Sequence, residues 1–399
     1  MSKTIGSSGA GSSAARSKAV ESNAVKSNAV ESNAVDRDVS APTVSKRVPF
    51  WDNARFMCVM LVVVGHGIQR LTYESNNALT VYLFIYAFHM PAFAIISGYF
   101  SKATPPNATR MRRILTDLLL PYFVMESIWT LVKFLVEGPT EFNPSEPSWT
   151  LWFLLALGIF RLILPYFALL KWPLFWAVVV SIGVGYLSNV DSTFSLSRAI
   201  GILPFFVLGW KVRQWGLVDK WRLMHAQAWY VRGGAVAVFL VWFAAVAIFI
   251  QTWRAMELRF WFFYDYSYTG LGAGEWWAGL VRLALILLAT ILSAAFFVLM
   301  PRGQTWITAF GQATMYIYLL HSFVLYPIRE TGILLDEHSS AVWLVSMIFA
   351  SMAISIVLAS PWAQKIFRPF VQPRANWLFQ KAGERPPKRR ADATGSRPD

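Results

Sequence analysis

Runs of apolar residues recur along most of the chain and are separated by short polar segments. A helix needs about 20 such residues to cross about 30 Å of hydrocarbon. The pattern therefore predicts an all-α, polytopic integral membrane protein with about ten transmembrane helices. The expected spans are residues 50–71, 79–100, 114–136, 149–170, 173–189, 198–213, 231–252, 277–300, 306–328 and 341–363.

The two ends of the chain lack this apolar pattern. Residues 1–45 contain a tandem repeat of five residues, Ala19-Val-Glu-Ser-Asn, then Ala24-Val-Lys-Ser-Asn and Ala29-Val-Glu-Ser-Asn. A period of five fits neither a helix nor a strand, so we expect a disordered cytoplasmic tail. Residues 46–370 are expected to form the transmembrane domain, and residues 371–399 a second, basic cytoplasmic tail.

Charged residues between the expected spans indicate an orientation. With the N-terminus inside, basic residues gather in alternate loops, as they do on the cytoplasmic side of membrane proteins. An even number of spans returns the basic C-terminus to that side, so both termini are expected in the cytoplasm. The inner loops contain Lys46, Arg47, Lys102, Arg110, Arg112, Arg113, Lys171, Lys211, Arg213, Lys220, Arg222, Arg232 and Arg302, and the outer loops Glu74, Glu141, Glu146, Asp191, Glu257, Asp265, Glu275, Glu330, Asp336 and Glu337.

Composition supports the membrane class. Apolar residues make up 56% of the chain and charged residues 15%, against about 25% charged residues in soluble domains. The net charge of +14 is explained by cytoplasmic loops that face anionic lipid, so we expect no nucleic-acid partner and a multi-pass protein of the plasma membrane. Cys58 is the single cysteine, and no metal-ligand spacing is present, so no metal site is expected.

Two ionisable residues in the first expected span are the main candidates for chemistry, because such residues are costly inside a membrane. Arg55 and His66 are eleven positions apart, which places them within about 20° of one helical face and about 16 Å apart along the axis. Gly65 and Gly67 flank the histidine and are expected to leave room for a substrate. The alternative is a snorkelling arginine and a structural histidine.

Four further residues are secondary candidates. His89 and His321 are expected at a depth similar to that of His66, so the three histidines are compatible with one site. Ser97 precedes Gly98 at the expected cytoplasmic end of the second span, where close helix packing is the alternative interpretation. Trp152 belongs to the fourth span, and an interfacial aromatic belt would equally explain it.

Arg110, Arg112 and Arg113 stand before the third span. Three arginines at a cytoplasmic helix end are an ordinary orientation signal, and they also suit the phosphates of a ligand such as coenzyme A. Arg161 lies within the fourth span and needs a partner, for which Glu126 is the candidate.

Taken in order, these segments resemble the membrane acyltransferase-3 family, in its fucose 4-O-acetyltransferase-like and glucan succinyltransferase-like branch. The resemblance covers residues from about 48 to 365. It rests on Arg55-x10-His66, Phe88-His-Met-Pro, Ile96-Ser-Gly-Tyr-Phe, Arg112-Arg113 before Leu120-Pro-Tyr, Trp152-Phe-Leu, Pro204-Phe-Phe-Val-Leu-Gly and Tyr318-Leu-Leu-His321.

The resemblance implies an O-acyltransferase that moves an acyl group, with acetyl expected, from cytoplasmic acyl-CoA to a hydroxyl of a carbohydrate or glycan acceptor. It implies that Arg55 and His66 are essential and that acyl-CoA is a co-substrate, with no bound cofactor. Two other functions remain open. The chain could transport a lipid-linked sugar or small polar solute, or serve as a sensor or scaffold.

Overall fold

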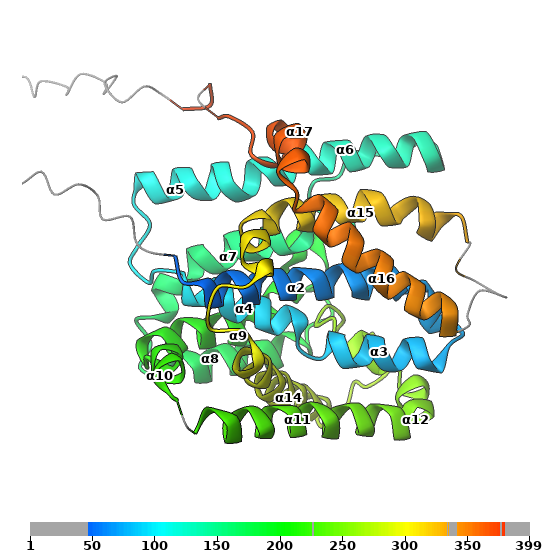
Figure 1. Cartoon of the computed structure of the whole chain (residues 1–399). Helices are drawn as coiled ribbons and strands as arrows, with labels where there is room; N and C mark the ends of the chain where they lie inside the picture. The colour runs from blue at the N-terminus through cyan, green and yellow to red at the C-terminus, as the bar shows by residue number, and fades with distance from the viewer. Residues whose placement is uncertain (1–46, 226, 333, 335–340, 376, 380–399) are drawn as a thin grey trace, which may run out of the picture. The chain divides into compact units, whose positions relative to one another are not determined.

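The computed structural model describes residues 47–225, 227–332, 334, 341–375 and 377–379. The chain divides into two units, Met1–Arg47 and Val48–Asp399, and all that follows concerns the second. Every regular element in the described residues is a helix, which confirms the expected all-α class (Figure 1). The five-residue repeat and most of the predicted C-terminal tail lie outside the described residues, so both tails stay predictions.

The first half of this unit contains the helices that carry most of the candidate residues. They are α2 (Pro49–Ile68), the 3₁₀ turn η1 (Arg70–Tyr73), α3 (Asn76–Tyr86), α4 (His89–Tyr99), α5 (Ala108–Ile114), the π segment η2 (Leu115–Leu119), α6 (Leu120–Glu137), α7 (Trp152–Phe167) and α8 (Pro173–Val184).

The second half adds two further helices of the site, α9 and α15, and several helices that surround it. The elements are η3 (Thr193–Ser195), α9 (Leu196–Gln214), α10 (Leu217–Leu223), α11 (Ala228–Ile248), α12 (Ile250–Ala255), α13 (Leu258–Trp261), α14 (Ala278–Leu299), η4 (Trp306–Ala313), α15 (Thr314–Glu330), α16 (Ala341–Leu358) and α17 (Pro361–Val371).

Each of the ten expected spans contains a helix, but fewer helices are long and apolar enough to cross a membrane. Six in the described residues meet that requirement: Asn76–Tyr99, Ala108–Glu137, Thr193–Gln214, Ala228–Ile248, Ala278–Leu299 and Ala341–Leu358. The helices α7 and α8 are apolar but shorter. The polar residues Asp52, Asn53, Arg55 and His66 lower the mean hydropathy of α2.

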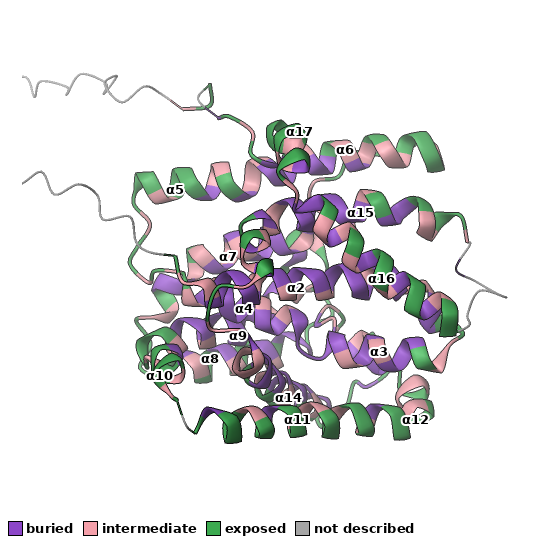
Figure 2. Ribbon diagram, viewed as in Figure 1, coloured by how far each residue is buried: buried purple, intermediate pink, exposed green. Residues whose placement is uncertain are grey.

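The outer helices carry many exposed residues (Figure 2), and many of those side chains are apolar. On α11, Leu240, Val241 and Ile248 are all more than 60% exposed, and Val345 and Phe349 of α16 are exposed as well. Exposed apolar surface on this scale is typical of a protein that faces lipid rather than water.

Helix α2 lies at the centre of the helix packing and is itself largely buried (Figures 1 and 2). It contacts η4, α15, α16, α4 and α3. Because its neighbours come from both halves of the chain, α2 can bring residues distant in sequence to one site.

Helices α4 and α9 pack closely against each other, and two glycines permit it. A Cβ atom on Gly98 would lie 1.9 Å from the backbone oxygen of Phe206, and one on Gly209 would lie 2.0 Å from that of Ile95. Both backbones therefore approach to a distance that a larger residue excludes. The packing interpretation of the Ser97-Gly98 segment is confirmed for the glycine.

Two irregularities interrupt the expected second and third spans. Helix α3 ends at Tyr86 and α4 begins at His89, with Phe88 in a non-helical conformation between them. This break lies just before Pro91, which therefore occupies the first turn of a new helix. The third span contains the π segment Leu115–Leu119 ahead of Pro121, and π segments are frequent at functional sites.

Candidate active site

One uninterrupted helix, α2, presents both main candidates, but to two different cavities. Arg55 lines a cavity of about 550 Å³, whereas His66 lines one of about 150 Å³. Both residues lie on this one helix, as expected. Each lines its own chamber.

The smaller cavity, called here the histidine chamber, is formed by segments far apart in the sequence. Its polar groups come from α2, the adjoining Gln69, α3, α4, α7, α9 and α15, and its aromatic groups include two tryptophans and two phenylalanines. The lining residues are Val62, His66, Gln69, Tyr86, His89, Met90, Trp149, Thr150, Trp152, Arg198, Ile202, Phe262, Phe263 and Tyr318.

The structure brings the three candidate histidines together. The ring centroids of His66 and His321 are 5.5 Å apart, and His89 lines the same chamber as His66. His89 and His321 each place Nδ1 3.0 Å from the carbonyl oxygen one turn earlier, at Ile85 and Ile317. His321 is completely buried and lies behind His66, outside the chamber lining.

The glycines beside His66 do not open a path for substrate, contrary to expectation. A Cβ atom on Gly65 would lie 2.7 Å from the ring of Tyr86, and one on Gly67 would lie 2.2 Å from Oγ of Ser351. Both glycines instead allow neighbouring helices to pack closely around His66. The free space beside His66 is the histidine chamber, which this residue lines.

Sequence reasoning missed Arg198 of α9. Its guanidinium group forms an ion pair with Asp265 and lies 4.7 Å from the ring centre of Trp152, so an aromatic face and a fixed cation adjoin one another in the histidine chamber. The sequence feature that could have identified Arg198 as a candidate is its place at the first position of the expected span 198–213.

Trp149 forms another wall of this chamber. Its ring centroid is 5.2 Å from that of His66, and the guanidinium carbon of Arg329 lies 4.9 Å from its ring centre. Its φ angle of 37° is unusual for a residue other than glycine, and such strained residues persist where the surroundings fix them.

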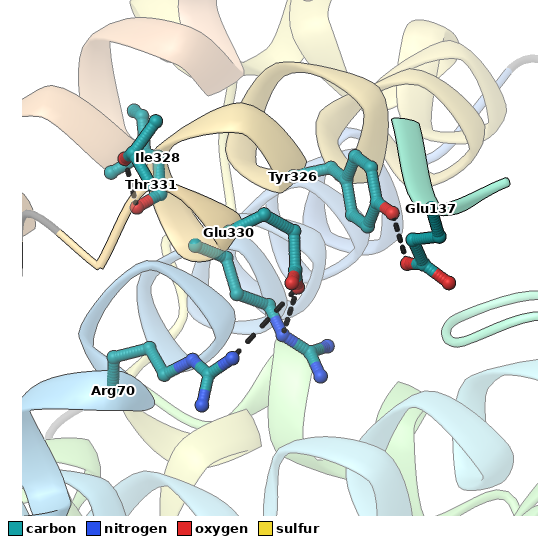
Figure 3. Close-up of polar contacts among 7 residues, drawn as sticks. Arg70, Glu137, Tyr326, Ile328, Glu330 and Thr331 are labelled. Atoms are coloured by element: carbon teal, nitrogen blue, oxygen red, sulfur yellow. Dashed lines mark hydrogen bonds and ion pairs between the residues drawn. The ribbon is translucent and has the colours of Figure 1, made fainter. Parts of the chain in front are cut away.

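Polar contacts at the end of α15 tie that helix to its neighbours (Figure 3). Glu330 pairs with Arg329 at 3.3 Å and with Arg70 of η1 at 3.8 Å. Tyr326 donates a hydrogen bond to Glu137 at the end of α6 (Figure 3). These contacts hold Arg329 against the tryptophan wall of the chamber.

The expected pair of Arg161 with Glu126 is wrong. Glu126 accepts hydrogen bonds from the backbone nitrogen of Ser148 at 2.8 Å and from its hydroxyl at 2.6 Å. It therefore anchors the segment that leads into Trp149. Arg161 faces the larger cavity.

That larger cavity, called here the basic chamber, is lined by several cations. Five basic side chains and one carboxylate, that of Asp117 in the π segment, face it. The lining residues are Arg55, Phe93, Ile96, Ser97, Phe100, Ser101, Lys102, Arg110, Arg113, Ile114, Asp117, Leu118, Phe153, Leu154, Leu157, Arg161, Thr314, Met315 and Tyr318. Such a concentration of cations is suited to a ligand that carries several phosphates.

The structure separates the three candidate arginines before α6. Arg110 and Arg113 line the basic chamber, but Arg112 does not. The guanidinium group of Arg112 instead lies 4.3 Å from the ring centre of Phe379. Ser97 also lines the basic chamber, and its hydroxyl donates a hydrogen bond to the carbonyl oxygen of Phe93 at 2.9 Å.

Tyr318 lines both chambers. Its hydroxyl donates a hydrogen bond to the carbonyl oxygen of Thr150, which also lines the histidine chamber. The two chambers therefore adjoin at this side chain.

Comparison with known proteins identifies the family. A family model described as an acyltransferase domain, acyltransferase-3, matches residues 48–360. Nodulation protein NolL of Mesorhizobium japonicum is 27% identical over 211 residues, which cover 48% of this chain and 56% of that protein. The chain thus matches just over half the length of this curated relative, and no solved structure matches it. Because the family model covers most of the chain, this multi-pass membrane protein belongs to the acyltransferase-3 family.

Proposed function

We propose that this chain is a membrane O-acyltransferase, which moves an acetyl group from cytoplasmic acetyl-CoA to a hydroxyl of a carbohydrate acceptor. One observation carries the proposal. A chamber lined by five cations adjoins a chamber that contains His66, and Tyr318 lines both. Membership of the acyltransferase-3 family supports the same reaction class.

The basic chamber is the proposed donor site. Arg55, Lys102, Arg110, Arg113 and Arg161 match the multiple phosphates of coenzyme A, and arginine binds phosphate oxygens through paired hydrogen bonds. With the nucleotide held there, the flexible arm of the donor extends past Tyr318. The thioester then reaches the histidine chamber.

The histidine chamber is the proposed acceptor site. Trp149 and Trp152 offer aromatic faces, while Arg198 and Gln69 offer donors for hydroxyl oxygens. A pocket with mostly aromatic walls and a few fixed polar groups suits a small, partly apolar ligand such as a sugar ring. Its volume of about 150 Å³ admits one reacting end of a glycan rather than a long segment.

His66 acts as the general base in this mechanism. It removes the proton from the acceptor hydroxyl, and the oxygen attacks the thioester carbonyl carbon. When the tetrahedral intermediate collapses, the carbon–sulfur bond breaks and the coenzyme A thiolate takes the proton from His66. The ester product and free coenzyme A leave, and the histidine returns to its neutral form.

We also propose the orientation of the chain in the plasma membrane. Ten spans with both termini in the cytoplasm place Arg110 and Arg113 on the cytoplasmic side, where acetyl-CoA is available. The alternation of basic and acidic loops supports this arrangement.

The test uses the purified protein in lipid nanodiscs with acetyl-CoA labelled in its acetyl group. A panel of p-nitrophenyl hexosides serves as acceptor. The proposal predicts release of free coenzyme A together with labelled, base-labile acetyl esters on at least one glycoside. In a parallel experiment the protein is reconstituted into sealed vesicles with a radiolabelled hexoside outside. Accumulation of that hexoside inside the vesicles, without any acetyl ester, would instead support a transporter.

A further inference from the structure

His321 stands out because it is completely buried and lies directly behind the proposed base. It comes from α15, its exposed fraction is 0%, and its ring is tilted by 32° to that of His66 with the centroids 5.5 Å apart. It lines neither chamber, so it cannot touch a substrate there. A polar ring in such a place calls for a structural or positioning role.

The hydrogen bonding of His321 fixes which of its nitrogens carries the proton. Nδ1 lies 3.0 Å from the carbonyl oxygen of Ile317. A carbonyl oxygen can only accept, so Nδ1 must be the protonated nitrogen of the neutral ring. The other nitrogen, Nε2, therefore bears a lone pair. It is buried and has no hydrogen-bond partner in the described part of the chain.

The neighbouring ring of His66 also has a nitrogen that lacks a hydrogen-bond partner. Its Nδ1 is also buried and forms no hydrogen bond of normal geometry among the residues that the structure describes, although the side chain of Gln69 is a second polar neighbour of this ring. Two buried nitrogens on adjacent rings are thus both unsatisfied, and one of them is an obligate acceptor. If Nδ1 of His66 carries a proton, a small ring rotation or one bridging water satisfies both groups.

We propose that His321 is the positioning residue of His66. Its Nε2 accepts a hydrogen bond from Nδ1–H of His66, which leaves the lone pair of the catalytic ring on Nε2, on the chamber side. When His66 takes up the acceptor proton, its Nδ1–H becomes a stronger donor to His321. This inference rests on the proposed role of His66 as the base and adds the group that fixes its tautomer.

His89 provides an internal comparison. It makes the same Nδ1 contact with a carbonyl oxygen one turn earlier, at 3.0 Å, but its ring packs on Tyr86, with centroids 4.5 Å apart. It has no ring contact with His66 among the described residues. The arrangement of His66 with His321 is therefore specific to that pair.

Two measurements test the proposal on the full-length protein in nanodiscs. The first compares kcat and KM for acetyl-CoA, with a p-nitrophenyl hexoside as acceptor, in His321→Leu, His321→Asn and His321→Gln. The amide of Gln reaches the position of Nε2 and can accept from His66, whereas that of Asn reaches only the position of Nδ1. We expect Leu and Asn to lower kcat by about 10- to 100-fold at nearly constant KM, because an orienting group beside a catalytic histidine is lost. Gln should restore most of the activity.

The second measurement reads the tautomer directly, by solid-state ¹⁵N NMR of histidine-labelled protein. The His66 signals are identified as those absent from His66→Gln. We expect the Nδ1–H form of His66 in the wild type and in His89→Gln, and a shift toward the Nε2–H form in His321→Leu.

Two results would overturn the proposal: a folded His321→Leu protein with kcat within twofold of wild type, or a wild-type His66 in the Nε2–H form. The NMR result needs no turnover. An absence of acetyl transfer by wild type would therefore count against the proposed function, while the tautomer is judged separately.

Discussion

At the scale of single residues, the main difference between sequence and structure concerns which side chains share a cavity. The spacing of Arg55 and His66 predicts that both share one helical face, and α2 contains both residues. No pattern in the sequence could show that Arg161 turns to the basic chamber or that Arg198 enters the histidine chamber. Those positions depend on how distant helices pack, which local periodicity does not encode.

Arg113 and Arg112 form a matched pair for testing donor binding. They are adjacent on α5, but only Arg113 lines the basic chamber. Arg113→Gln should raise the KM for acetyl-CoA by about tenfold, since one charge-assisted contact with phosphate is lost. Arg112→Gln should leave that KM within a factor of about two. Equal effects in both variants would show that the chamber is not the donor site.

Arg198 tests acceptor binding. Arg198→Lys keeps the charge beside Asp265 but loses the planar group next to Trp152. We expect the KM for the glycoside to rise about tenfold, which corresponds to the loss of a contact worth about 1.4 kcal/mol. The KM for acetyl-CoA should not change. Arg222→Lys is the control, because Arg222 forms an exposed pair with Asp219 on α10. A selective rise in the KM for acetyl-CoA would reverse the assignment of the two chambers.

At the scale of helices, apolar run length predicted where the helices lie, and each expected span contains one. It could not predict the break between Tyr86 and His89, because residues 79–100 form one continuous apolar run. Nor could it reveal the π segment Leu115–Leu119, whose extra residue per turn leaves no signature in hydropathy.

The crossing of α4 and α9 offers a stability test. Gly98→Ala would place a methyl group 1.9 Å from the backbone oxygen of Phe206, so the two helices must separate. We expect a loss of about 1–3 kcal/mol in stability, visible as a lower thermal unfolding temperature in detergent. Gly233→Ala on α11 is the control, since a Cβ atom there meets nothing within 4 Å. Equal unfolding temperatures for the two variants would argue against the close crossing.

At the scale of the whole molecule, the positions of the helices do not determine how the chain is oriented in the membrane. Within the described part of the chain, six helices meet the requirement for spanning, while the loop charges favour ten spans. The native Cys58 is buried, so an introduced cysteine reports on its own position.

Glu141→Cys and Lys171→Cys test the two sides of the membrane. Both residues are exposed. In intact cells a membrane-impermeant maleimide should label the first variant, whereas the second should react only after permeabilisation. Reporter fusions at residues 40 and 390 should both indicate the cytoplasm. Labelling of Lys171→Cys in intact cells would contradict the proposed orientation.

The most direct test of the account compares wild type with His66→Gln for transfer of labelled acetyl from acetyl-CoA to a p-nitrophenyl hexoside. Glutamine keeps hydrogen-bonding capacity but cannot take the hydroxyl proton, so transfer should fall about 100- to 10,000-fold. His225→Gln, at an exposed histidine between α10 and α11, should transfer at the wild-type rate. Wild-type turnover in a folded His66→Gln protein would show that the base lies elsewhere and would contradict the central claim.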